Sequence, residues 1–183
     1  MKFADPCSRP MKTTKILGVD IGRVIINGDG PDTSFLSASD DDAMAAPAMD
    51  GVIASLTRLT RLFEGRVWIV SKCGPRIQER SRAWLAHHRF FELTGIPKNQ
   101  IRFCRKRHEK APICLELGIG TFVDDRLDVL LPMAGIVEHR FLFGASTSPD
   151  RGVVAVPTWA AAEAAITPIA LRPEARTPAG RAR

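Results

Sequence analysis

The sequence lacks the long apolar runs of a membrane protein and the cysteine patterns of a zinc-binding or disulfide-rich protein. No apolar run approaches the roughly 18 residues that a membrane-spanning helix needs. The first fifteen residues lack the apolar core of a secretion signal, so we expect a cytoplasmic protein with reduced thiols. The cysteines form no CxxC pair and have no zinc-like spacing; they are Cys7, Cys73, Cys104 and Cys114.

Net charge is small everywhere except at the two ends. The formal net charge is +6, of which residues 1–15 contribute +3 and residues 171–183 contribute +3. Residues 16–170 hold eighteen charges of each sign. The Pro, Gly, Ala and charge content of the ends predicts disordered tails over residues 1–14 and 171–183. We therefore expect neither a nucleic-acid partner nor a membrane partner.

The rest of the chain has the size and composition of one globular domain. The protein has 183 residues, of which 45% are hydrophobic and 25% are charged. We expect a single core domain over residues 15–170, and no internal repeat is visible in it.

Short β-rich runs alternate with helical patterns along this domain. Six runs are predicted to be strands: Ile16–Val19, Val67–Val70, Ile101–Cys104, Thr121–Val123, Arg140–Phe143 and Val153–Val156. Helices are predicted from Val52 to Phe63, from Pro75 onward, and from near Pro112 to a stop at Gly118. Continuous apolar strands between helices predict an α/β fold, a three-layer sandwich with a mostly parallel, Rossmann-like sheet.

The stretch Asn27–Pro47 is predicted to be a short insert after the first strand, in the form of a loop or small flap. It is rich in Gly, Asp, Ser and Ala and shows no clear period. Its acidic run, Asp40–Asp42, is more typical of a solvent-facing segment or a helix N-terminus than of a metal site.

Polar side chains follow the first, second and fourth predicted strands, and a lysine begins the helix that leads into the fourth strand. In chain order they are Asp20, Ser71, Lys72, Lys110, Asp124, Asp125 and Asp128. Because ligands of an open parallel sheet bind outside the carboxyl ends of its strands, we expect these residues to gather at one edge. Carboxylates suit Mg²⁺ that is bound together with waters and a phosphate, and the hydroxyl and ammonium groups suit the other phosphate oxygens.

This set of residues resembles the haloacid dehalogenase (HAD) superfamily. The family's four motifs are represented, in order, by GVDIGRVI, VWIVSKCG, the region of Lys110, and FVDDRLDVL, which together cover Ile16 to Asp128. The later segment VVAVPTWAAAEAAI fits the family's closing strand and helix. The resemblance implies a HAD core and, as for most members, a Mg²⁺-dependent phosphatase that works through a phospho-aspartate. The short insert implies a small-cap member, a group that takes bulky substrates or closes its sites by homo-oligomerisation.

The resemblance also implies the role of each polar residue. Asp20 matches the nucleophile that attacks phosphorus. Ser71, with Lys72 beside it, matches the hydroxyl that binds a phosphoryl oxygen. Lys110 matches the lysine that neutralises the nucleophile and the phosphate, and Lys106 is the weaker alternative. A dianionic phosphate repels an aspartate, so a metal and a cation are what make its approach tolerable.

The implied Mg²⁺ site consists of Asp20, Asp124 and Asp125 with the backbone carbonyl of Gly22, which also borders the substrate. In the family's phosphatases the position of Gly22 is usually a second aspartate, which protonates the leaving group and then activates water. Glycine cannot transfer a proton, and general acid–base help is worth roughly 10²–10⁴-fold in rate.

Two functions therefore stay open. The first is a Mg²⁺-dependent phosphatase-like hydrolase that acts on a small phosphorylated substrate through a phospho-aspartate at Asp20. Its proton would come from Asp29, Asp32 or the substrate itself. The second is a catalytically impaired domain that binds a phosphorylated ligand or protein partner. Asp20 and Lys110 favour the first function, whereas Gly22 favours the second.

Other polar groups have simpler interpretations. The basic run Arg102–Lys110 is more typical of a solvated face than of a recognition patch. His87 and His88, at a helix end, are interpreted as surface or capping residues, and His108 as a bystander. Cys73 is interpreted as a small buried residue that fills space.

Overall fold

The fold is built on one sheet of six strands in the order β3-β2-β1-β4-β5-β6. A computed structural model describes residues 15–28, 39–149 and 151–173 of the chain. The strands are β1 (Leu17–Val19), β2 (Val67–Lys72), β3 (Ile101–Cys104), β4 (Thr121–Asp124), β5 (His139–Phe143) and β6 (Val153–Val156). Every neighbouring pair of strands is parallel, which confirms the predicted α/β sandwich.

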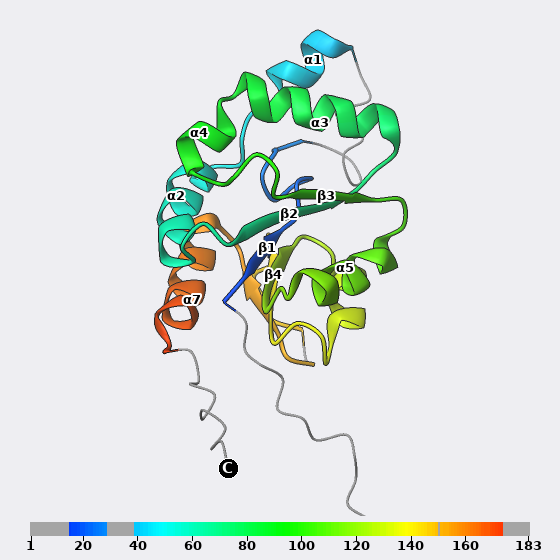
Figure 1. Ribbon diagram of the computed structural model, residues 1–183. Coiled ribbons are helices and arrows are strands. Elements are labelled where there is room, and N and C mark those ends of the chain that lie inside the picture. The colour runs from blue at the N-terminus through cyan, green and yellow to red at the C-terminus, as the bar shows by residue number, and fades with distance from the viewer. Residues whose placement is uncertain (1–14, 29–38, 150, 174–183) are drawn as a thin grey trace, which may run out of the picture.

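Helices cover both faces of the sheet (Figure 1). Those of the described residues are α1 (Asp40–Ala45), α2 (Val52–Leu62), α3 (Pro75–His87), α4 (Phe90–Thr94), α5 (Lys110–Leu117), α6 (Leu127–Leu130) and α7 (Trp159–Leu171), with two 3₁₀ turns, η2 (Arg107–Glu109) and η3 (Leu131–Met133). The helices α1 to α4 and α7 share one hydrophobic core with the sheet, and α5 and α6 share another on the opposite face. The molecule therefore has the three layers that the sequence predicts.

Strands that are apolar on both sides explain these layers. In β1, Leu17 and Val19 belong to the core beneath α2 and α7, whereas Gly18 faces the other core. A Cβ atom on Gly18 would lie only 2.3 Å from the ring of Phe122 in β4, so glycine makes room for that ring. A parallel sheet with both faces buried requires such apolar or small residues at every position.

The predicted elements agree closely with the observed ones. All six predicted strands are present, with bounds shifted by no more than two residues. The three predicted helices correspond to α2, α3 and α5, and Gly118 ends α5 in the left-handed conformation. The helices α4 and α6 are too short to produce a helical period in the sequence, and they were not predicted.

The predicted insert Asn27–Pro47 holds a helix that its sequence pattern did not indicate. Ser39 caps α1: its hydroxyl accepts from the N–H of Asp42 at 3.1 Å and donates to the Asp42 carboxylate at 2.5 Å. The acidic run thus begins a helix, in agreement with its interpretation as an N-terminus. Residues 29–38 of the insert lie outside the described residues.

The insert is fastened to α3. The indole N–H of Trp84 donates to the carbonyl of Ala46 at 2.8 Å, and Nε2 of His88 lies 3.0 Å from the carbonyl oxygen of Met44. His88 is therefore a half-buried contact to the insert, whereas His87 is exposed as predicted.

The strand order creates a switch point between β1 and β4. The chain moves from β1 outward to β2 and β3, and then crosses back to β4, β5 and β6. In doubly wound sheets the loops after the two central strands diverge, and ligands bind in the crevice between them. Asp20 directly follows β1, and Asp124 is the last residue of β4. The topology therefore brings these two acids to the position where a ligand is expected.

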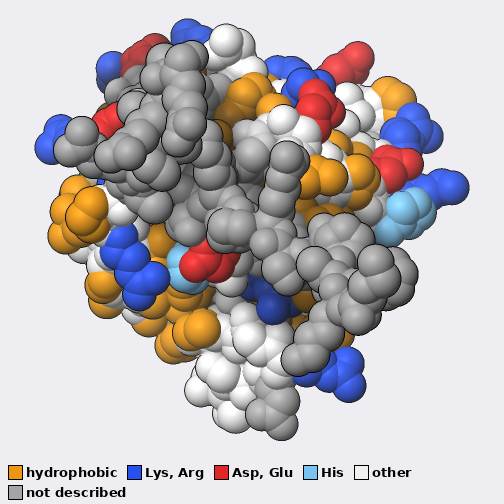
Figure 2. All heavy atoms as spheres, turned by 60° about the horizontal axis from the view of Figure 1, so that its bottom comes forward, with side chains coloured by type: hydrophobic (Ala, Val, Ile, Leu, Met, Phe, Trp, Pro, Cys, Tyr) orange, Lys and Arg blue, Asp and Glu red, His pale blue; other side chains and the backbone are white. Residues whose placement is uncertain are grey.

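Charged side chains of both signs are mixed on one face of the molecule. On the face seen in Figure 2, the Lys and Arg side chains of the described residues are interspersed with Asp, Glu and hydrophobic side chains. Among the described residues, no helix is both long and apolar enough to cross a membrane.

Candidate active site

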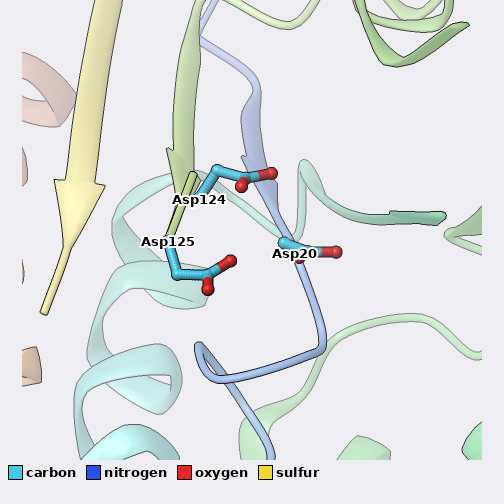
Figure 3. Close-up of side chains that lie close together, drawn as sticks. All are labelled: Asp20, Asp124 and Asp125. Carbon is cyan, nitrogen blue, oxygen red and sulfur yellow. The ribbon is translucent and has the colours of Figure 1, made fainter. Parts of the chain in front are cut away.

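Asp20 lies where β1 ends and the chain turns sharply. The carbonyl of Ile21 accepts hydrogen bonds from the backbone N–H groups of Ile25 (2.8 Å) and Ile26 (3.0 Å), which closes the turn. These isoleucines are buried in the main core, so the apolar run around Asp20 continues the core beyond the strand. Asp20 itself lies beside the end of β4 (Figure 3). This explains why one acid interrupts an apolar run.

Lys110 connects the acids at the ends of β1 and β4. Its Nζ lies 2.9 Å from Oδ1 of Asp20 and 2.7 Å from Oδ2 of Asp124. The contact with Asp124 is a well-directed hydrogen bond, whereas the contact with Asp20 is an ion pair that leaves Oδ1 without a well-directed hydrogen bond. The side chain of Lys110 is only 2% exposed and that of Asp124 is fully buried. A buried ammonium thus lies between two carboxylates.

Burial and charge together set the protonation of these groups. Although burial opposes its charge, Asp124 and Asp20 raise the pKa of Lys110 above its ordinary value, so the ammonium stays charged. Burial raises the pKa of the Asp124 carboxyl, and Lys110 offsets part of this rise. Burial, followed by the charge of Asp20, raises the pKa of Asp125 to about 6. Raised carboxyl pKa values beside a charged ammonium follow from crowding these acids in a buried site.

Three carboxylates converge in this crevice (Figure 3). One oxygen from each of Asp20, Asp124 and Asp125 lies within 4.8 Å of the others. Asp124 is held in place by the N–H of Arg126, which donates to its Oδ1 at 3.0 Å. Converging carboxylates with lone pairs to spare are a donor set that suits a hard divalent cation such as Mg²⁺. The residues thus fit the metal that the sequence led us to expect.

Asp128 does not belong to this carboxylate cluster. Its carboxylate accepts from Nε of Arg126 at 2.9 Å and lies 3.9 Å from a guanidinium nitrogen of Arg107. Asp128 is therefore placed to position two arginines and not to bind the same cation.

A small hollow, the Asp20 pocket, has the side chain of Asp20 in its wall. Four of its lining residues are cationic, and the wall consists of Asp20, Gly22, Ser71, Lys72, Arg107, Lys110, Arg126 and Val129. The pocket has room for about 10 Å³, enough for about one water molecule. A phosphoryl group would enter only if part of the wall moved. Arg107 and Arg126 are partly exposed members of that wall, with side chains that are 34% and 29% exposed.

The residues predicted to bind substrate meet in this pocket. Ser71 and Lys72 reach it from the end of β2, and Gly22 reaches it from the turn after β1. Ser71 is buried. Lys106 does not line the pocket: it is exposed, and its N–H donates to the Glu109 carboxylate. Of the two lysines predicted as candidates, Lys110 lines the pocket and Lys106 does not.

Three arginines at the site were missed by sequence reasoning. In the basic run Arg102–Lys110 the side chains of Arg102, Arg105, Lys106 and His108 are exposed, in agreement with a solvated face, but this interpretation is wrong for Arg107, which lines the pocket. Arg126 directly follows the acid pair at the end of β4. Arg23 follows Gly22, has a positive φ of 59°, and places Nε 3.5 Å from Oδ2 of Asp125. Arg23 and Arg126 stand in the loops after the central strands β1 and β4, and this position could have identified them, whereas Arg107 lies in η2 after the edge strand β3.

The cysteines of the described residues do not belong to this cluster. Cys73, Cys104 and Cys114 are buried free thiols. Burial and the nearby Asp20 charge raise the pKa of Cys73 to about 12, so this thiol stays protonated at neutral pH. Asp29 and Asp32, the predicted alternative acids, lie outside the described residues.

A larger hollow, the side pocket, adjoins the carboxylate cluster on its β5 side. It has a volume of about 530 Å³ and is lined by Arg23, Asn27, Gly28, Met49, Asp125, Leu142, Phe143, Gly144, Ala145 and Pro157. Asp125 belongs to both the cluster and this wall. The carboxylates therefore separate a small cationic pocket from a large pocket with mixed walls.

The chain matches no model of a known protein family, and no curated protein matches it. The resemblance noted in its sequence therefore depends on four short motifs, and these are the segments that supply the acids, the hydroxyl and the lysine described above.

Proposed function

We propose that this protein is a Mg²⁺-dependent phosphatase of the HAD type, which transfers the phosphoryl group of a phosphate monoester to Asp20 and then to water. The observation that carries the proposal is the buried Lys110 ammonium, 2.9 Å from Asp20 and 2.7 Å from Asp124. A buried cation at a nucleophile is costly to maintain and is a common device for attracting an anionic substrate.

In the first half-reaction a carboxylate oxygen of Asp20 attacks phosphorus, and the bond between phosphorus and the ester oxygen breaks. The Lys110 ammonium, 2.9 Å from Oδ1 of Asp20, attracts the phosphoryl oxygens, to which the Ser71 hydroxyl donates a hydrogen bond. Asp20, Asp124 and Asp125 with the carbonyl of Gly22 would hold Mg²⁺, which when bound supplies positive charge against the phosphoryl oxygens.

In the second half-reaction water attacks the phosphorus of phospho-Asp20, which releases phosphate and restores the carboxylate. Gly22 offers no side chain to protonate the leaving oxygen or to take a proton from water. The leaving group therefore departs as an anion unless Asp29, Asp32 or the substrate itself supplies the proton. This favours esters of acidic alcohols, such as phenols.

A second function is favoured by the size of the Asp20 pocket. Room for about one water, together with the glycine at position 22, also suits a domain that binds a phosphorylated ligand and hydrolyses it slowly or not at all. Such a domain would be stabilised by phosphate compounds but would release no phosphate.

Phosphate release distinguishes the two functions. With Mg²⁺, the parent protein is expected to release phosphate from phenyl phosphate, and Asp20→Asn is expected to lower the rate at least about 10³-fold, because an amide cannot serve as the nucleophile. Asp41→Asn is the matched control, since this acid is exposed on α1. A parent that releases no phosphate, or an Asp20→Asn variant that releases it undiminished, would contradict the proposal.

A further inference from the structure

Two arginines of the Asp20 pocket converge on one carboxylate, that of Asp128. Nε and a terminal nitrogen of Arg126 donate to the two oxygens of Asp128 at 2.9 Å and 3.3 Å. A guanidinium nitrogen of Arg107 lies 3.9 Å from the same carboxylate. Paired hydrogen bonds of this kind are the way in which a guanidinium group recognises a carboxylate. The two side chains are therefore already directed toward one carboxylate position.

These arginines belong to the same pocket as the candidate nucleophile. Arg107 and Arg126 line the Asp20 pocket together with Asp20 and Ser71. A phosphoryl group at Asp20 would therefore have its ester oxygen next to a wall that includes both guanidinium groups. The organic part of a substrate, which is attached to this oxygen, comes within reach of the two arginines.

The cations of this pocket lie at two depths. The side chain of Lys110 is only 2% exposed, and it contacts the carboxylate of Asp20. Arg107 and Arg126 are partly exposed, and the side chain of Asp128 that they share is 54% exposed. The buried ammonium is thus placed for the phosphoryl group. The arginines lie on the solvent side, toward which the organic part of a substrate extends.

The outer group of three side chains carries a net positive charge. Arg107 and Arg126 contribute two positive charges and Asp128 contributes one negative charge. Because exposed ion pairs contribute little to stability, a carboxylate from a ligand can share or take the position of Asp128 at little cost. An anionic organic group is therefore attracted to this side of the pocket, and a cationic one is repelled.

We propose that Arg107 and Arg126 form a carboxylate subsite on the solvent side of the Asp20 pocket, so that the preferred substrates are phosphate monoesters whose organic part carries a carboxylate. The inference rests on the proposed function for its reaction, but the preference for a carboxylate can be measured without any hydrolysis.

Three phosphonates that cannot be hydrolysed test the subsite by isothermal titration in the presence of Mg²⁺. They are 3-phosphonopropionate, propylphosphonate and 2-aminoethylphosphonate, which carry a carboxylate, a methyl group and an ammonium group on the same two-carbon chain. We expect the parent to bind 3-phosphonopropionate about tenfold more tightly than propylphosphonate, because the carboxylate gains charge-assisted hydrogen bonds. The parent should bind 2-aminoethylphosphonate more weakly than either of the others.

Variants of the two arginines show whether they cause this preference. Arg107→Gln and Arg126→Gln should each lower the ratio of the two affinities about threefold, and the double variant should bring it close to one. Arg105→Gln is the matched control, because Arg105 is an exposed arginine of the same basic run that does not line the pocket. It should keep the ratio of the parent. If the double variant does not fold, the two single variants decide.

Phosphate release from phenyl phosphate, measured on the same proteins, separates this inference from the proposed function. A preference for the carboxylate without any phosphate release would contradict the proposed function and leave the subsite in place. The subsite would be overturned, even with phosphate release, if the parent bound 3-phosphonopropionate no more tightly than propylphosphonate or bound none of the phosphonates. An unchanged ratio in the arginine variants, or an equal loss in Arg105→Gln, would also overturn it.

Discussion

Gly22 lines the Asp20 pocket. In the HAD superfamily, which the sequence resembles, this position usually carries the proton donor. The φ angle of Gly22 is not positive, so the backbone does not by itself exclude a side chain there. A carboxyl group added at this position would adjoin Asp20 and Ser71, the groups proposed to contact the phosphoryl group. The same residue thus offers a direct experiment on the source of the proton.

Gly22→Asp is expected to change the preference of the enzyme between leaving groups. Esters of weakly acidic alcohols need a proton at the leaving oxygen, so glycerol phosphate hydrolysis should rise up to roughly 10²-fold relative to phenyl phosphate hydrolysis. The measurement is kcat/KM for both esters in parent and variant. A well-folded variant with an unchanged ratio would mean that the proton comes from elsewhere, and Asp29 and Asp32 would be the next residues to replace.

The carboxylate cluster predicts how stability depends on pH and Mg²⁺. Burial and the charge of Asp20 raise the pKa of Asp125 from 3.8 to about 6, so without metal the folded protein holds this proton more tightly than the unfolded chain. Stability without metal should therefore fall as the pH rises from about 4 to about 6, by at most about 2–3 kcal/mol. Mg²⁺ competes with protons for the carboxylates, so it should stabilise the protein more at pH 8 than at pH 5.

Thermal melts with and without Mg²⁺ at the two pH values measure this effect. Asp125→Asn should reduce both the fall with pH and the stabilisation by Mg²⁺, whereas Asp41→Asn should change neither, because Asp41 is exposed. Stabilisation by Mg²⁺ that is the same at pH 5 and pH 8, or the same in Asp125→Asn, would show that these acids do not bind the ion.

The sequence predicted that Asp20, Lys110 and Asp124 meet, but it also included Asp128 and left Lys106 as an alternative, and it did not indicate which arginines accompany them. Asp20, Lys110 and Asp124 each stand at a strand end or helix start, where the topology of a parallel sheet fixes their direction. Arg107 stands in a run of basic residues, most of which face solvent, and only the packing of η2 places it in the pocket. Side-chain direction in irregular loops depends on tertiary contacts, which sequence patterns do not contain.

At the scale of elements, β1 is the strand whose packing positions the site. It lies between β2 and β4, and Asp20 follows it directly. Gly18 faces Phe122, whose ring would lie 2.3 Å from an added Cβ atom, and Ile119 would lie 3.0 Å away. Any side chain at position 18 must push β4 or this ring aside.

Gly18→Ala is therefore expected to destabilise the protein by roughly 1–3 kcal/mol. Gly74→Ala is the matched control, since nothing lies within 4 Å of a Cβ atom there and its φ of −80° suits any residue. Denaturant unfolding of the parent and both variants gives the comparison. Equal stability of the two variants would show that the contact between β1 and the Phe122 ring is looser than described.

The strands were predictable because each is a short apolar run that both faces of a parallel sheet require. The helices α2 and α3 were predictable because apolar faces or a first-turn proline mark them. Helix α1 was not, because its six residues include three consecutive aspartates, and its position depends on Ser39 and on contacts with α3. Short helices held by tertiary contacts leave little trace in sequence periodicity.

At the scale of the whole molecule, the strand order distributes charge unevenly around the crevice. Cations follow β2 and β3, among them Lys72 and Arg107, whereas residues 144–149 after β5 carry no charged side chain. The neutral body predicted from the sequence thus contains a cationic side next to the carboxylates.

The central claim is that Asp20 becomes phosphorylated during turnover. The most direct measurement is to quench the parent protein in the middle of phenyl phosphate hydrolysis with Mg²⁺, reduce any acyl phosphate with borohydride, and sequence the peptides by mass spectrometry. Homoserine is expected in place of aspartate at position 20, with no such conversion in Asp20→Asn or without substrate. Phosphate release at full rate while Asp20 stays unmodified in every quenched sample would contradict the claim.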